Sequence, residues 1–148
     1  DHGEMLGEHH LWAKHCFYEG AVQVPLIISP PDRESRGVCR DLTQLIDVVS
    51  TLADIGQVEP PEGAQGQSLL PILDNGAGGY EYIFSTIQDW TGVRNEDYRF
   101  TLDIPTGTPC ELYDLAKDPG ELNNCVEDQE YQVIVELLKE VVLDHRAG

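Results

Sequence analysis

An apolar run, VQVPLIISPP at residues 22–31, places the strongest limit on what this chain can fold into. Its β-branched residues and its length of about seven residues before two prolines predict a buried strand. A strand that is apolar on both faces usually lies inside a sheet that is covered on both sides. Such a strand needs neighbours, so the run predicts that the chain takes part in an α/β sheet.

Two helices and a group of short strands are predicted in the rest of the chain. Residues 40–56 are the clearest amphipathic helix, and Gly56 is well placed to end it. The short aromatic and β-branched segments from residue 80 to 115 predict a small antiparallel sheet. Residues 128–146 form a second amphipathic helix, with Asp128 as its candidate N-cap. The buried face predicted for the first helix consists of Leu42, Leu45, Ile46, Val49, Leu52 and Ala53.

This order of elements divides the chain near residue 80. Residues 1–79 read as the last part of an α/β domain, and residues 80–148 read as an appended α+β subdomain with an antiparallel sheet and a C-terminal helix.

The charge of the chain excludes two classes of partner. There are 27 acidic and 9 basic residues, which give a formal net charge of −18. Nucleic acids and anionic membrane surfaces are both bound through clustered Lys and Arg. We therefore expect neither a nucleic acid nor a membrane as a partner.

The first fifteen residues, DHGEMLGEHHLWAKH, hold four of the five histidines. At a strand end or a tight turn, the adjacent Asp1 and His2 can both reach one cation, but two ligands do not complete a metal site. Lys14 would repel a cation unless an anion such as sulfate or phosphate lies between them. A solvated histidine-rich tail explains the same pattern, and a zinc site at the later histidines fits no zinc-finger spacing.

Five features follow one another in the first part of the chain: D-H-G-E, L-G-E-H, a lysine, Y-E-G and V-P-L-I. This series resembles the pattern D-H-G-E, L-G-[ED]-H, Lys, Y-[ED]-G and V-P-L-I of the sulfatase family. That family belongs to the alkaline-phosphatase superfamily, which also includes phosphonate monoester hydrolases. The similarity continues through QLIDVVSTLADIG, GQSLLP, GVRNEDYRFTLD and ELYDLAKDPGELNN. It covers almost the whole chain, and the order of the motifs is the family's order.

The resemblance implies roles for four residues. Asp1 and His2 would be ligands of a divalent cation, and Lys14 would contact a sulfate oxygen and stabilise charge on the leaving oxygen. His9 would help to shape the substrate pocket. Calcium is the usual cation of the family, while the imidazole of His2 favours manganese or zinc.

The nucleophile of the family is a formylglycine made from the first residue of a C/S-x-P-x-R motif. We expect no such motif in this chain, since none of the four cysteines begins one. We therefore expect the formylglycine, and two further Asp ligands, in an N-terminal part outside this chain. The chain would then be the C-terminal part of an alkaline-phosphatase-like α/β sandwich with its small α+β subdomain, and would be inactive alone.

Three functions follow from this interpretation. The parent protein would be a sulfuric ester hydrolase that acts on a small sulfate ester or a sugar sulfate. A phosphonate or phosphate monoester hydrolase of the same superfamily is the alternative. In the third, the chain is a non-catalytic truncated module that associates with itself through apolar surfaces at residues 22–30 and 42–53.

Overall fold

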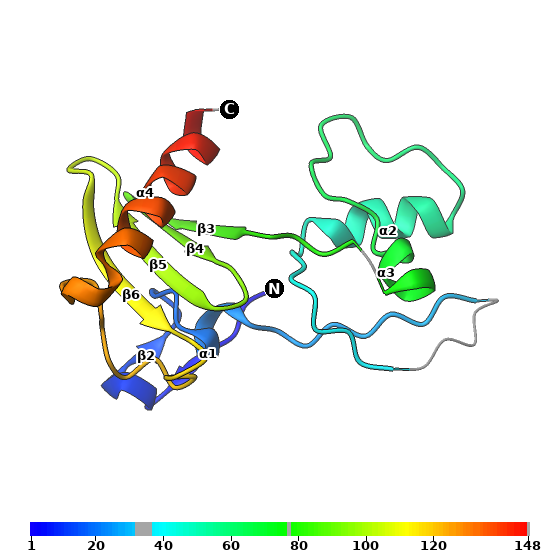
Figure 1. Cartoon of the computed structure of the whole chain (residues 1–148). Helices are drawn as coiled ribbons and strands as arrows, with labels where there is room; N and C mark the ends of the chain where they lie inside the picture. The colour runs from blue at the N-terminus through cyan, green and yellow to red at the C-terminus, as the bar shows by residue number, and fades with distance from the viewer. Residues whose placement is uncertain (32–36, 77, 148) are drawn as a thin grey trace. The chain divides into compact units, whose positions relative to one another are not determined.

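The computed structural model describes residues 1–31, 37–76 and 78–147, and divides into two compact units (Figure 1). The first unit combines Asp1–Val24 with Phe84–Gly148, and the second is Pro25–Ile83. The predicted division into residues 1–79 and 80–148 differs from these units, because residues 1–24 pack with the later sheet. As domains of a longer protein, the two predicted segments stay a prediction.

A four-stranded sheet forms the centre of the first unit, with its strands side by side in chain order. Its strands are β3 (Ile83–Ile87), β4 (Trp90–Arg94), β5 (Tyr98–Asp103) and β6 (Thr108–Asp114). β4 pairs with β5, and β5 with β6, both antiparallel, which confirms the predicted small sheet. Asn95 closes the β4–β5 turn, because its side-chain oxygen accepts the amides of Asp97 and Tyr98 at 3.1 and 2.7 Å.

The C-terminal helix covers one face of this sheet. The 3₁₀ helix η2 (Gln129–Tyr131) leads into α4 (Gln132–Ala147), which packs against β4, β5 and β6. Val135, Leu138 and Val142 are buried at the spacing of one helical face, as the sequence predicts. Asp128 precedes η2 with an extended backbone, but its side chain makes no capping hydrogen bond.

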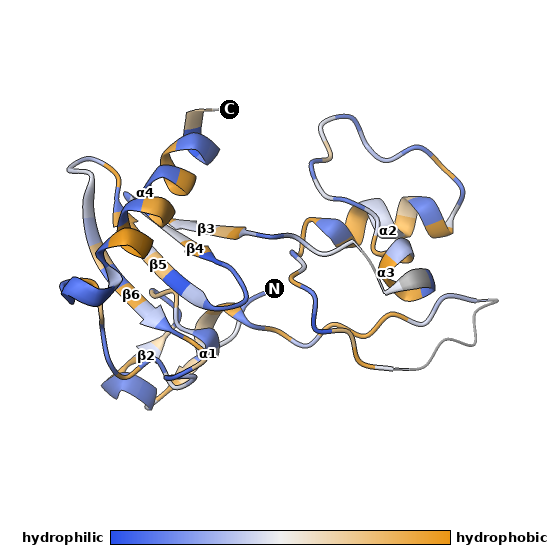
Figure 2. Ribbon diagram, viewed as in Figure 1, coloured by the Kyte–Doolittle hydropathy of each residue, from blue (hydrophilic) through white to orange (hydrophobic). Residues whose placement is uncertain are grey.

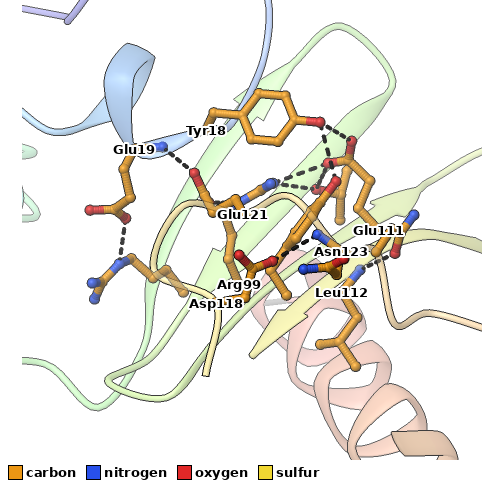
Figure 3. A network of polar contacts seen from close by, with 12 residues as sticks. Tyr18, Glu19, Arg99, Glu111, Leu112, Asp118, Glu121 and Asn123 are labelled. Atoms are coloured by element: carbon orange, nitrogen blue, oxygen red, sulfur yellow. Dashed lines mark hydrogen bonds and ion pairs between the residues drawn. The ribbon is translucent and has the colours of Figure 1, made fainter. Parts of the chain in front are cut away.

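The N-terminal residues contact the opposite face of the sheet. They form β1 (Met5–Leu6), η1 (Glu8–His10), β2 (Trp12–Ala13) and α1 (Glu19–Val22), and β1 pairs with β2 as an antiparallel hairpin. Phe17 is buried against Gly92 of β4, where an added Cβ would lie 2.9 Å from the Phe17 ring. In Figure 3, Tyr18 and Leu112 lie on opposite sides of the sheet, and α4 is on the Leu112 side.

The second unit contains α2 (Asp47–Ile55) and α3 (Leu70–Asn75). The predicted helix at 40–56 is therefore too long, although it does end at Gly56. Its predicted buried face is also wrong. Only Ala53 of that face is buried, and the other buried residues of α2 are Asp47, Ser50 and Thr51. Asp47 explains the late start, because its carboxylate accepts the Gln44 amide at 2.7 Å and stops the chain from continuing the helix backwards.

The prediction of a buried strand at residues 22–31 is wrong for this structure. Val22 ends α1, residues 23–30 have no regular secondary structure, and Ile27 is 91% exposed. Figure 2 shows the stretch as a largely hydrophobic trace. A strand forms only beside a partner that takes its backbone hydrogen bonds, and no strand of the described residues lies beside this one.

A membrane-crossing helix would need a longer and more apolar stretch than any helix in the described part of the chain provides.

Candidate functional site

Asp1, His2 and Lys14 lie together, and their predicted roles as metal and sulfate ligands stay predictions. The Lys14 ammonium contacts Nε2 of His2, and Oδ1 of Asp1 lies 3.5 Å from the same nitrogen. Nδ1 of His2 lies 2.7 Å from the carbonyl oxygen of Gly3. Because a carbonyl oxygen can only accept, we assign the proton of the neutral ring to Nδ1, which leaves the lone pair of Nε2 free to bind a donor or a cation.

These groups are open to an incoming ligand. The Asp1 side chain is 91% exposed and that of His2 is 37% exposed. One carboxylate and one imidazole nitrogen suit a divalent cation, but they amount to two ligands. Within residues 1–31, 37–76 and 78–147, no group of three or more His, Cys, Asp or Glu side chains is placed to hold a metal ion. The described residues therefore fit part of a metal site.

The glycines and acids of the opening motif shape the loop that carries Lys14. The Gly3 amide donates to the Ala21 carbonyl at 2.8 Å, and a side chain at Gly3 would collide with the backbone of Gly20. Gly7 has φ +123°, which favours glycine. The Glu8 carboxylate accepts the Leu6 amide at 2.7 Å, and hydrogen bonds from the Glu8 and Leu6 amides hold the pKa of Glu8 below its usual value.

His9 contacts a different part of the first unit. Its ring stacks on Tyr18 with 3.9 Å between the centroids and 9° between the planes. Among the described contacts, none joins His9 to His2 or Lys14. The predicted role of His9 in substrate binding stays a prediction.

A largely buried ionic cluster is centred on Arg99 and includes Tyr18 (Figure 3), and sequence reasoning did not identify it. We call Tyr18, Arg99, Glu111, Tyr113 and Glu121 the Arg99 cluster. Arg99 donates from Nε to Glu121 and from Nη1 to Glu111, the latter at 3.0 Å, and its guanidinium lies over both tyrosine rings. Burial alone would lower the pKa of Arg99, but the two carboxylates raise it above its usual value. The available signal was Arg99 itself, a charge inside the apolar strand YRFTL.

The expectation that the C/S-x-P-x-R motif is absent needs a correction. It holds for the four cysteines, but Ser29 begins the sequence S-P-P-D-R, which matches the motif letter for letter. The third and fourth residues after Ser29 lie outside the described residues. In the family order the nucleophile precedes the D-H-G-E segment, whereas Ser29 follows it. We therefore do not assign Ser29 as the nucleophile.

Sequence comparison relates nearly the whole chain to one family. The family described as "N-sulphoglucosamine sulphohydrolase, C-terminal" matches residues 7–148. A choline-sulfatase of Rhizobium meliloti is 34% identical over 86% of this chain and 26% of that protein. A delta 4,5-hexuronate-2-O-sulfatase of Bacteroides thetaiotaomicron is 30% identical over 99% of this chain and 32% of that protein.

Solved structures give the same result. A phosphonate monoester hydrolase from Silicibacter pomeroyi superposes with a TM-score of 0.86 at 27% identity, over 99% of this chain and 33% of that one. A Bacteroides thetaiotaomicron protein described as a sulfatase superposes with a TM-score of 0.83 at 29% identity, over 97% of this chain and 34% of that one. The chain thus spans about a quarter to a third of the length of these proteins.

Proposed function

This chain belongs to the sulfatase family, in the part described as N-sulphoglucosamine sulphohydrolase, C-terminal, and on that premise we propose that it supplies part of the active site of a metal-dependent sulfuric ester hydrolase. The expected family and the alkaline-phosphatase-like fold are confirmed. The observation that carries the finer proposal is the meeting of Lys14 with His2 and Asp1 at an exposed position.

In this proposal Lys14 binds the sulfate group. Its ammonium has three donors and already contacts the lone pair of His2 Nε2. A sulfate oxygen is an anionic acceptor and would draw the ammonium away from the neutral imidazole. Lys14 would then stabilise the negative charge that develops on the leaving oxygen as the ester bond breaks.

Asp1 and His2 would hold the divalent cation, through Oδ of the carboxylate and Nε2 of the ring. When bound, the cation would supply Lewis-acid stabilisation of the sulfate group. Movement of Lys14 onto the substrate would release Nε2 for this role. Calcium, manganese and zinc are the candidate cations, and formylglycine is the expected nucleophile in the remainder of the parent protein.

Manganese provides a test of these ligands that does not depend on activity. Paramagnetic Mn²⁺ added to the 148-residue chain should broaden the ring signals of His2 before those of His145 on α4. Asp1→Asn, which keeps the His2 ring, should abolish that preference and leave the slower broadening at His145 unchanged. Equal broadening at all histidines would argue against a cation at Asp1 and His2.

The parent activity requires the whole reading frame. We expect the coding sequence upstream of Asp1 to contain C/S-x-P-x-R, and the full protein to hydrolyse a sulfate ester. Lys14→Met should lower kcat/KM by about a hundredfold or more, the usual effect of losing one donor to the transition state. An upstream sequence without the motif would contradict the proposal, and so would turnover by the 148-residue chain alone, which we expect to be inactive.

Sugar sulfates are the substrate class that we favour. One relative is a delta 4,5-hexuronate-2-O-sulfatase, and one structural neighbour was solved with D-glucosamine-2-N,6-O-disulfate. That neighbour superposes with a TM-score of 0.72. Comparing kcat/KM for a sulfated glucosamine with that for an aryl sulfate would test the preference.

A phosphonate monoester hydrolase is the second candidate, because two such enzymes superpose on this chain with TM-scores of 0.83 and 0.86. Rates of the full protein on matched sulfate and phosphonate esters would separate the two functions. A higher kcat/KM on the phosphonate would favour this second candidate.

A further inference from the structure

We propose that Arg99 is a positioning residue for the candidate site. Through Glu111 and Glu121 it fixes Tyr18 and Glu19, and these two residues hold the loop that carries His9 and Lys14. The importance of this role for catalysis rests on the proposed function, but the positioning itself can be measured without any reaction.

The contacts run from the sheet to the loop in three steps. Arg99 on β5 binds Glu121 and Glu111. Glu121 accepts the backbone amide of Glu19 at 2.8 Å, and Glu111 lies 3.4 Å from the Tyr18 hydroxyl. The Tyr18 ring then stacks on His9. These bonds join residues that are 93 and 102 positions apart in the sequence, so local structure cannot replace them.

A second set of contacts reaches the metal-ligand end of the loop. The side chain of Glu19 pairs with Arg94 at 2.7 Å, while its backbone binds Glu121, so Glu19 is held from two sides. Two residues later, the Ala21 carbonyl accepts the Gly3 amide at 2.8 Å. Gly3 in turn accepts from the ring of His2. The position of His2 is thereby connected to the same anchor.

Burial and charge indicate that the Arg99 cluster orients side chains more than it stabilises the fold. Arg99 and Glu121 are 2% and 3% exposed, and Nη2 of Arg99 is buried with no hydrogen-bond partner among the described residues. One positive charge meets two negative charges. Apolar packing of similar volume is often at least as stable as a buried ion pair. The rigid fork of a guanidinium, however, sets the directions of both carboxylates, which apolar packing cannot do.

The test is an NMR comparison of Glu121→Gln with Glu136→Gln in the 148-residue chain. Arg99 and the Glu19 amide bind different oxygens of the Glu121 carboxylate, so a glutamine at 121 would present its NH₂ to one of these two donors. Glu136 is exposed on α4 and gives the same change of charge as a control. The two readouts are hydrogen exchange at the Glu19 amide and the upfield ring shift of His9 that stacking on Tyr18 causes.

We expect Glu121→Gln to speed exchange at the Glu19 amide by about tenfold or more relative to the Phe100 and Leu112 amides of the sheet. The His9 ring signals should lose their upfield shift, and Glu136→Gln should change neither. Glu111→Gln serves as a second variant should Glu121→Gln not fold, with loss of the His9 shift as its readout. Unchanged His9 and Glu19 signals in a folded variant would overturn the proposal, as would an equal rise in exchange at every amide. Because no substrate is used, neither result bears on the proposed sulfatase activity, which is tested separately.

Discussion

The carboxylate of Asp47 joins three segments of the second unit. Asp47 is 0% exposed and stands at the first residue of α2. One oxygen accepts the Gln44 amide at 2.7 Å, and the other accepts the Gln67 amide at 3.0 Å and the Tyr80 hydroxyl at 2.6 Å. Three segments of the chain therefore meet at one side chain, and Asp47→Asn is the perturbation that tests this.

The expected loss of free energy follows from the number of hydrogen bonds that the asparagine amide can still make. The side-chain oxygen of asparagine can keep the two bonds from Gln67 and Tyr80, and its NH₂ then faces the Gln44 amide, which is also a donor. One bond to a charged acceptor is lost, which costs about 1.5–3 kcal/mol. The reversed orientation would lose two bonds and is less favourable. We therefore expect Asp47→Asn to lower the opening free energy of α2 by about 2 kcal/mol.

Native-state hydrogen exchange of the α2 amides is the assay, because it reports this unit alone. A loss of about 2 kcal/mol corresponds to exchange faster by about 30-fold. Asp54→Asn is the matched control, since Asp54 is exposed on the same helix and, among its described bonds, its carboxylate accepts only the Ser68 hydroxyl. It should change exchange by less than about threefold. Equal effects of the two substitutions would refute the reasoning.

Three further predictions concern single positions. Gly92→Ala should destabilise the first unit by about 1–3 kcal/mol, because its Cβ would overpack Phe17; an unchanged urea midpoint would contradict this. Burial raises the pKa of Asp114, but hydrogen bonds from Lys117 and Tyr131 lower it by a larger amount, so the pKa lies below its usual value. Its contribution to stability is thus present at neutral pH and lost as the pH falls through that lowered pKa. In Asp114→Asn the melting temperature should fall less steeply below about pH 4 than in the unsubstituted chain. An equally steep fall in both proteins would argue against this role of Asp114. Ile27→Ser should reduce self-association in light scattering and change the unfolding free energy by less than about 0.5 kcal/mol, since Ile27 is 91% exposed; undiminished association would exclude residues 22–30 as the contact.

The sequence predicted the elements whose partners are close in the chain. The strands from Ile83 to Asp114 alternate with short turns, and each pairs with the next, so local patterns suffice. The helix after Asp128 packs its periodic face onto that same sheet. For Asp1, His2 and Lys14 the sequence predicted an anion between Lys14 and a cation, whereas in the structure Lys14 contacts His2 directly, and their roles as ligands stay a prediction.

The failures have one physical cause, which is that burial depends on neighbours as well as on pattern. Residues 22–30 and the apolar face of α2 have the periodicity of buried segments, yet Ile27, Val49 and Leu52 are exposed in this chain. Conversely, Arg99 is charged and nevertheless buried, because two glutamates distant in sequence pair with it. The order of apolar and charged residues along the chain therefore predicts neither the exposure of these apolar residues nor the burial of Arg99.

The bond between Glu19 and Glu121 has a consequence for how the protein is made. The two residues are 102 positions apart, so the anchor of the opening loop leaves the ribosome long after the loop itself. At a synthesis rate of about 5–20 residues per second, that delay is about 5–20 seconds. Until β4, β5 and β6 have been synthesised, the segment from His9 to Glu19 has no complete sheet to bind and is open to chaperones and proteases. The candidate site is therefore completed from the C-terminal side, and the loop that carries His9 and Lys14 is anchored long after its own residues are synthesised.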